Sequence, residues 1–322
     1  MSNSKNWLSK LDNLKGYTVF LNLMYKCRSL INELVTPLLI KIGVIGAKTV
    51  GITINGNMLL QLNKDSALGS KGTILEIPRD KVIFEFVRRK GLWELEESQF
   101  IAQALLSAHR RSNSSKIALI DIGANTGLVT LQALNLAKTK TEVFLFEPIP
   151  RHISAIKRNL GHFSNIHLNE FALSYKNGQS QIFTESTNHG NSSLLNSVVP
   201  KDRMISNTIK IVQTDKFFAR NLNKFASYVI KCDTQGMDAL ILSRIPRSIW
   251  KKCESAVVEI WSIKEIRSAD VDKLLDMWKD FQFFNWHPDF TGGNIKLDEI
   301  KEFWLKKSGK ARNLFLSKFP SF

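Results

Sequence analysis

The sequence contains few cysteines, and the three that it has are far apart. Cys27, Cys232 and Cys253 form no pair at the spacing of a metal-binding or redox motif. The shortage excludes a disulfide scaffold and favours a reducing compartment. We also predict no secretion signal, because no compact apolar region with a small-residue cleavage site follows the lysines near the N-terminus. We therefore expect a cytoplasmic protein.

A long uninterrupted apolar run is also missing. The most apolar stretch, residues 36–54, contains several glycines and is interrupted by Lys41 and Lys48. A helix that spans a bilayer needs about 20 mostly apolar residues. The stretch instead predicts a partly buried helix and a turn, with a membrane-surface element as the alternative.

Acidic residues are scarce relative to basic ones. The chain has 45 Lys and Arg against 29 Asp and Glu, a formal net charge of +16, and the excess lies at both ends. No basic stretch is interleaved with aromatic residues, and no zinc-finger or helix-turn-helix signature is present, so we expect no specific nucleic acid partner. A solvated basic surface and a peripheral contact with an anionic membrane, at its inner surface, both fit this charge.

The composition is that of an ordered protein, with 43% hydrophobic and 23% charged residues among 322. Apolar residues recur at helical spacing from Trp7 to about Lys48, which indicates one or two amphipathic helices. Branched residues at 52–61 and 72–77 flank a turn-rich run and predict a β-hairpin, and 82–87 predicts a third short strand. We expect a helical and hairpin extension over residues 1–71 and one larger domain over residues 72–322.

The larger domain has the pattern of parallel βαβ units. After a helix predicted at 94–109, short apolar runs alternate with amphipathic helices, which favours a doubly wound α/β fold. The expected strands are 117–122, 142–146, 167–173, 228–233, 256–261, 282–286 and 313–317. Helices are expected between them at 128–137, 151–160, 237–243 and 269–279, with an additional antiparallel pair of strands at 179–184 and 208–214.

The first of these strands runs into a glycine turn, Asp121-Ile122-Gly123-Ala124-Asn125-Thr126-Gly127. Gly123 can take positive φ and lets the backbone approach a ligand, while Gly127 permits the helix start to pack closely on the strand. Asn125 tolerates a left-handed conformation, but it stands near the place where a dinucleotide fingerprint has its middle glycine. Asp121 would repel a pyrophosphate at the helix N-terminus and suits the ammonium and sulfonium of S-adenosylmethionine instead.

A second acidic residue ends the next strand. Glu147 lies 24 residues after Gly123, near the offset of roughly 20 at which an acid accepts hydrogen bonds from ribose hydroxyls. Pro148 and Pro150 then force a turn at the carboxyl end of the strand, where ligands bind in open α/β sheets. These residues indicate a cofactor that carries a nucleoside.

Four stretches closely resemble the FkbM family of S-adenosylmethionine-dependent methyltransferases, over about Val82 to Trp261. They are Ile120-Asp121-Ile122-Gly123-Ala124-Asn125-Thr126-Gly127; Phe146-Glu147-Pro148 with Lys157-Arg158-Asn159-Leu160; Ala172-Leu173-Ser174 with Gly178; and Ile230-Lys231-Cys232-Asp233-Thr234-Gln235-Gly236-Met237-Asp238. Gly91-Leu92-Trp93-Glu94 also resembles the start of the family's domain. The family pattern has an acid directly before the glycine at 236, where this chain has Gln235.

The resemblance implies a seven-stranded, Rossmann-like methyltransferase sheet whose last strand is antiparallel, and O-methylation of a glycan, lipid-linked sugar or secondary metabolite. S-adenosyl-L-methionine is the implied cofactor. The residues expected to bind it are Asp121, Gly123, Ala124, Asn125, Gly127, Glu147, Pro148 and Ala172.

Methyl transfer requires alignment of the acceptor and removal of its proton. Asp233, at the end of the fourth strand, is the first candidate for base or acceptor-orienting residue. His189, in a polar run expected to be a loop, is a second because its ordinary pKa suits proton transfer near neutrality. Glu259 stands between apolar strand residues, where a carboxylate is costly unless it lines a pocket. Lys231 is a possible pocket cation.

The other residues of interest have structural interpretations. His152 is expected to face solvent near the cofactor rim, and His287 to be structural. Asp233, Glu259 and His189 could converge on a metal, but their spacing does not establish one, and we predict none. Two other functions remain open: an NAD-dependent oxidoreductase, which would favour glycine where Asn125 stands, and a non-catalytic protein whose basic ends bind nucleic acid or membrane.

Overall fold

A computed structural model describes residues 45–112, 116–289 and 293–319. The helices predicted from Trp7 onward lie outside the described residues as far as residue 44. The helix predicted within residues 36–54 is wrong for the described part of that stretch, because Ala47–Ile52 forms strand β1. Within the described ranges, no helix is both long and apolar enough to cross a bilayer.

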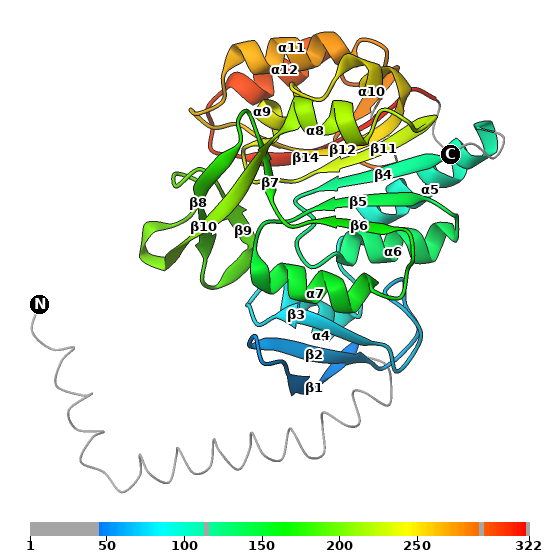
Figure 1. Ribbon diagram of the computed structural model, residues 1–322, viewed down its shortest axis with the longest axis vertical. Helices are drawn as coiled ribbons and strands as arrows, with labels where there is room; N and C mark the ends of the chain where they lie inside the picture. The colour runs from blue at the N-terminus through cyan, green and yellow to red at the C-terminus, as the bar shows by residue number, and fades with distance from the viewer. Residues whose placement is uncertain (1–44, 113–115, 290–292, 320–322) are drawn as a thin grey trace, which may run out of the picture.

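The centre of the fold is a seven-stranded sheet with the order β13-β14-β12-β11-β4-β5-β6 (Figure 1). The strands are β4 (Ile117–Ile122), β5 (Glu142–Phe146), β6 (Ile166–Asn169), β11 (Ser227–Cys232), β12 (Cys253–Trp261), β13 (Phe283–Asn285) and β14 (Ala311–Ser317). Strands β6, β5, β4, β11 and β12 pair in parallel, whereas β14 is antiparallel to both β12 and β13. The expected seven-stranded α/β fold with an antiparallel last strand is confirmed.

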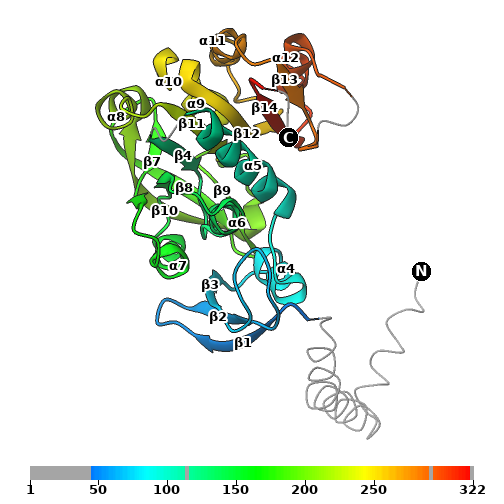
Figure 2. The ribbon, with the colours of Figure 1, turned by 90° about the vertical axis from the view of Figure 1, so that its right-hand side faces the viewer.

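Helices cover both faces of this sheet, as a doubly wound fold requires. Leu119 of β4 packs in one core with α5 (Leu95–Arg111), α6 (Leu128–Ala137) and α7 (Pro150–Leu160). Its neighbour Ile120 points to the other core. The helices of that second core are α8 (Thr214–Asn221), α9 (Asp238–Leu242), α10 (Arg247–Lys252), α11 (Ser268–Trp278) and α12 (Leu297–Leu305). Figure 2 separates α10–α12 from α6 and α7 at opposite sides of the sheet. β4 is buried along its whole length, which explains why all its residues except Asp121 are apolar.

A second sheet lies beneath α7 and consists of β1, β2 (Asn57–Leu62) and β3 (Ile74–Pro78) (Figure 1). The antiparallel pairing of β2 with β3 confirms the predicted hairpin. The division that we predict at residue 71 falls between these two strands, and as a division into folding units it stays a prediction.

The strand predicted at 82–87 is wrong, because Ile83–Lys90 forms helix α4. Ile83, Phe84 and Val87 are its buried residues, at the spacing of one helix face. Asp80 starts the helix by accepting hydrogen bonds from the backbone of Val82 and Phe84 through one carboxylate oxygen. The β-branched and aromatic residues in this run favour a strand locally, but a side-chain acceptor before it outweighs that preference.

A third, four-stranded sheet has the order β7-β10-β8-β9. Its strands are β7 (Ala172–Ser174), β8 (Gly178–Glu185), β9 (Asn188–Ser193) and β10 (Met204–Gln213). The antiparallel pairing of β8 with β10 confirms the predicted pair. The single strand predicted at 167–173 is wrong, since the chain turns at Phe171 and divides it between β6 in the central sheet and β7 in this one. The polar run around His189 is strand β9 instead of a loop.

One buried side chain ties the N-terminal sheet to the glycine turn. Asn159 of α7 accepts a hydrogen bond from the backbone of Glu76 at 2.8 Å and donates to the Glu76 carbonyl at 3.0 Å. Its amide also donates to the Thr126 carbonyl at 2.9 Å. β3, α7 and the glycine turn are thereby held by one residue, so the sheet of β1–β3 helps to place the site.

Candidate functional site

The glycine turn has the backbone conformation that its residues predict. Gly123, Asn125 and Gly127 all have positive φ, at 78°, 52° and 74°. A Cβ on Gly123 would lie 1.9 Å from the carbonyl oxygen of Asp233, so the close approach that requires glycine is made by the chain just after β11. A Cβ on Gly127 would lie 2.8 Å from the side chain of Leu160 on α7. The turn is therefore packed against two neighbours and cannot easily move.

Glu147 closes this turn from the end of β5. Its Oε2 accepts a hydrogen bond from the backbone N–H of Asn125, and its Oε1 accepts one from that of Ile149, both at 2.9 Å. The residue is 4% exposed. Because each carboxylate oxygen has about two lone pairs, one N–H on each leaves acceptor capacity for a ligand.

Asp121 has a different partner from the one that the sequence suggests. Its Oδ1 lies 3.1 Å from the ammonium of Lys231, and its Oδ2 accepts a 2.6 Å hydrogen bond from Thr130. Both members of this ion pair are almost fully buried. Asp121 and Gly127 are not among the described residues that line the two pockets beside the turn, so both support the site from behind.

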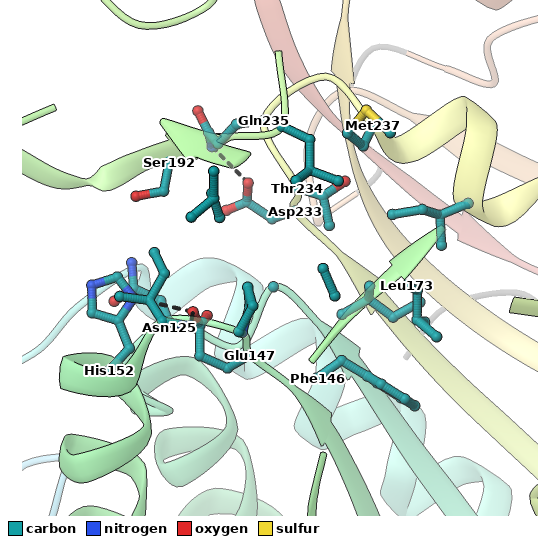
Figure 3. A pocket seen from close by; sticks show the side chains of 18 of the residues that line it. Asn125, Phe146, Glu147, His152, Leu173, Ser192, Asp233, Thr234, Gln235 and Met237 are labelled. Carbon is teal, nitrogen blue, oxygen red and sulfur yellow. Dashed lines mark hydrogen bonds and ion pairs between the residues drawn. The ribbon is translucent and has the colours of Figure 1, made fainter. Parts of the chain in front are cut away.

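The first of these pockets, here called the apolar pocket, opens at the carboxyl ends of β4, β5 and β11 (Figure 3). Most of its walls are apolar side chains: Ile122, Phe146, Ile149, Ala172, Leu173, Ile182, Leu194, Met237 and Ile241. Glu147, Pro148 and Asn125 line it at the glycine turn, while His189 and Ser192 come from β9. A flat heterocycle with a polar rim is the kind of ligand that such walls accommodate.

The second, the acidic pocket, adjoins the first and is bordered by Glu94, Asp233 and Glu259. Lys231 is its lining cation, and Trp93, Ala124, Asn188 and Asn191 add further wall. The carbonyl oxygens of the Asn125 and Asn191 side chains are buried and have no hydrogen-bond partner among the described residues. The residues that line both pockets are Gly123, Asn125, Gly190, Asp233 and Gln235. The acidic pocket is thus rich in acceptors and calls for a ligand that donates hydrogen bonds.

Gln235 holds two of these carboxylates together. Its side-chain amide donates to Asp233 Oδ1 at 2.6 Å and to Glu259 Oε2 at 2.8 Å. The residue has φ of 52°, and Ser193 donates to its carbonyl at 2.6 Å, so β9 fixes this turn. At this position a neutral amide supplies donors to both neighbours, where the acid of the family pattern would add a further buried negative charge.

Burial and the charge of neighbouring acids hold back the ionisation of Glu94 and Glu259. Burial, then the charge of Asp233, raises the pKa of Glu94 to about 7. The same two causes raise the pKa of Glu259 well above its ordinary value. Burial lowers the pKa of Lys231, but the carboxylates around it, Asp121 first, outweigh burial and raise it. Lys231 therefore stays charged while part of the acidic pocket is protonated near neutrality.

His189 lies in the apolar pocket with one nitrogen already engaged. Arg151 donates to its Nε2 at 2.9 Å, which requires that nitrogen to be unprotonated. Burial, then the charges of Arg151 and His152, lowers the pKa of His189 to about 4. Asp233 and Glu259 meet through Gln235, whereas His189 lines the other pocket. In the described part of the chain, no group of three or more His, Cys, Asp or Glu residues could hold a metal ion.

Three residues of the site were not predicted as such. His152 was expected to face solvent, but it is 1% exposed and lines the apolar pocket. The error has a visible cause, because His152 shares the buried face of α7 with Ile156 and Leu160 at helical spacing. Glu94 and Gln235 stand within the matched motifs, yet their place in the site depends on positive φ values that sequence does not display.

Comparison with known proteins finds only distant likeness to solved structures. No family model matches the chain, and neither does any curated protein. A precorrin-6y C5,15-methyltransferase from Geobacter metallireducens aligns with 14% identity and a TM-score of 0.31, over 68% of this chain and 87% of that one. A fibrillarin from Aeropyrum pernix, solved with natively bound S-adenosyl-L-methionine, aligns with 10% identity and a TM-score of 0.35, over 84% and 98%.

The bifunctional kinase-methyltransferase WbdD aligns with 9% identity and a TM-score of 0.38, over 72% of this chain and 41% of that one. Values this low leave the fold assignment to rest on the strand order itself. That order is a seven-stranded, Rossmann-like sheet of the methyltransferase kind, with one antiparallel strand.

Proposed function

We propose that this chain is an S-adenosylmethionine-dependent methyltransferase of the FkbM type that O-methylates a hydroxyl of a glycan, a lipid-linked sugar or a secondary metabolite. The observation that carries the proposal is the meeting of the two pockets at Asp233 and Gln235. The apolar pocket suits a nucleoside. The acidic pocket suits hydrogen-bond donors, which the methionine end of the cofactor and a polyhydroxylated acceptor both carry, and a carboxylate stands at the junction of the two pockets. Methyl transfer between two ligands needs this arrangement.

The residues present fit S-adenosylmethionine as the resident cofactor. Phe146, Ile149 and Leu173 offer apolar contact to an adenine, and Glu147 keeps acceptor capacity for ribose hydroxyls. The carboxylates of the acidic pocket suit the positive charges at the methionine end. When bound, the cofactor supplies a methyl group activated by its sulfonium.

The protein's own part is to place the acceptor and take its proton. Asp233 is the base that we assign, because it borders both pockets. Gln235 fixes the Asp233 carboxylate by donating to its Oδ1, which leaves Oδ2 for an acceptor hydroxyl. Glu259, Asn125 and Asn191 present further acceptor oxygens to a polyhydroxylated molecule. His189, with a pKa near 4 and Nε2 paired to Arg151, is a weaker candidate for the base.

Calorimetry with S-adenosylmethionine, S-adenosylhomocysteine and NAD tests the cofactor. We expect both adenosyl ligands to bind and NAD to give no heat. Tight NAD binding without a response to S-adenosylmethionine would sink the proposal and favour an oxidoreductase.

The acceptor class needs a separate experiment. Radiolabelled S-adenosylmethionine incubated with fractions of a cell extract should pass label into a glycan, lipid or small-molecule fraction. Label in protein or nucleic acid alone would contradict the O-methylation that we propose. The Asp233→Asn variant is the blank for label that enters without catalysis.

A further inference from the structure

His152 is a buried polar side chain that lacks a protein partner. It lies in the first turn of α7, is 1% exposed, and lines the apolar pocket. Neither of its ring nitrogens makes a hydrogen bond within the described part of the chain. Buried polar groups are nearly always paired, so two unpaired nitrogens on a pocket wall point to a ligand.

The neighbours of His152 do not remove this requirement. Its Nδ1 lies 3.4 Å from Glu147 Oε1, close enough for electrostatic attraction but without hydrogen-bond geometry. Arg151, the adjacent cation, donates to His189 instead. The rings of His152 and His189 are 6.5 Å apart between centroids, too far for a bond between them. The missing partner must therefore enter the pocket.

Glu147 and His152 together present two acceptors side by side (Figure 3). A proton on Nδ1 faces the Glu147 carboxylate and leaves the lone pair of Nε2 free to accept. Glu147 also has unused acceptor capacity, since each of its oxygens receives one backbone N–H. Two adjacent acceptors match the two hydroxyl donors of a vicinal diol.

We propose that His152 and Glu147 bind the 2′- and 3′-hydroxyls of the cofactor ribose, one each, and that His152 makes the site selective for a ribonucleoside. This inference rests on the proposed function, because it takes the ligand of the apolar pocket to be an adenosyl cofactor. It adds a specificity-determining residue that is not part of the matched motifs. The buried Glu147 carboxylate also rejects a phosphorylated ribose by charge repulsion.

Calorimetry with S-adenosylhomocysteine and its 2′-deoxy and 3′-deoxy analogues tests the assignment. The His152→Phe variant keeps a ring and removes both nitrogens. We expect it to lose about tenfold in affinity for S-adenosylhomocysteine, the effect of one lost hydrogen bond. It should bind one of the two deoxy analogues as tightly as the wild-type chain does, because that analogue lacks the hydroxyl that His152 accepts from.

His167→Phe is the matched control, since His167 is a histidine of the neighbouring β6 and does not border the apolar or the acidic pocket. It should bind all three ligands like the wild type. A His152→Phe variant that binds S-adenosylhomocysteine normally, or that loses the same factor for all three ligands, overturns the assignment and leaves the proposed function intact. A wild-type chain that binds none of them overturns the proposed function itself.

A measurement on the wild-type chain covers the case in which His152→Phe does not fold. The ¹⁵N resonances of the His152 ring should shift on addition of S-adenosylhomocysteine. They should shift much less with the deoxy analogue that the wild-type chain binds about tenfold more weakly. Equal shifts with all three ligands would contradict a bond to a ribose hydroxyl.

Discussion

The apolar and acidic pockets share the glycine turn and Asp233, yet they are built on different physical terms. The apolar pocket is walled mainly by side chains from strand ends and α9. Glu147, the carboxylate that lines this pocket but not the acidic one, is held by two backbone N–H groups. The acidic pocket gathers Glu94, Asp233 and Glu259 around one lysine, and burial raises the pKa of Glu94 and of Glu259. The first binds through contact and hydrogen bonds, and the second through charge.

This difference predicts how the binding free energy that each pocket contributes depends on pH. Contact with apolar walls changes little with pH or salt, whereas attraction to a partly protonated acidic pocket depends on pH. A molecule that spans both pockets would be held at one end by the fold itself. At the other end it would be held by carboxylates that are buried close to one another, where the charged form is costly. Variants that affect one pocket and spare the other can therefore separate binding from chemistry.

The largest effect is expected from Asp233→Asn, which removes the base at the junction and leaves the apolar walls as they are. Methyl transfer should fall by about 10²-fold to 10⁴-fold, the usual contribution of general base catalysis. The affinity for S-adenosylhomocysteine should fall by much less, about tenfold at most, because Asp233 is not among the ribose contacts that we assign, and Glu94 and Glu259 still attract the ammonium of the methionine end. Transfer assays with radiolabelled cofactor and calorimetry measure the two quantities.

The exposed Asp202→Asn serves as the control for a simple change of one carboxylate, since the Asp202 side chain is 72% exposed. Unchanged transfer in Asp233→Asn would move the base to Glu259 or His189. A parallel loss of transfer and of cofactor affinity would mean that the two pockets are not separable at this residue.

The regular part of the fold could be predicted from sequence because its signals are local. β4 and β5 begin and end where their apolar runs do, and the turn at Gly123 has the positive φ that its glycine indicates. The expected wall residues from the end of β5 and from β7, Glu147 and Ala172, do line the apolar pocket. Each of these positions is decided by neighbours a few residues away.

The acidic pocket could be predicted only in part, because its members come from distant segments. Asp233 and Glu259 stood out as acids at or near strand ends, but Glu94 joins them only through the packing of α5 beside β11 and β12. Lys231 pairs with Asp121, so the acid that seemed available for a ligand is neutralised within the protein. The wrong prediction of a strand at 82–87 has a similar cause, because Asp80, which lies outside that run, accepts the hydrogen bond that starts helix α4.

Asn159→Ala should act on both pockets equally, because Asn159 supports the glycine turn that they share. The variant leaves the Glu76 backbone and the Thr126 carbonyl without three buried hydrogen bonds. We expect a loss of about 3 kcal/mol in the free energy of unfolding, measured by urea denaturation. The matched variant Asn135→Ala removes one bond, to the Ala67 carbonyl, and should cost about 1 kcal/mol. Equal losses would show that the three hydrogen bonds of Asn159 stabilise the chain no more than the single bond of Asn135.

Glu94→Gln should affect only the acidic pocket, and its effect should be seen in how the free energy of unfolding depends on pH. The pKa of Glu94 is raised from 4.5 to about 7 on folding, so the folded chain holds this proton more tightly than the unfolded chain does. The free energy of unfolding therefore falls as pH rises from 4.5 to about 7, and is constant in this respect on either side. Since Glu94 is partly exposed, solvent screening reduces the effect to on the order of 2 kcal/mol.

Glu94→Gln cannot ionise and should flatten that decline, which thermal unfolding at pH 4.5, 6 and 7.5 would measure. Some slope should persist, because Glu97 and Glu259 also have raised pKa values from burial and from neighbouring acids. The control is Glu96→Gln, on the exposed side of the same helix, which should keep the wild-type slope. If both variants kept that slope, the acidic pocket would not be under the electrostatic strain that distinguishes it from the apolar pocket.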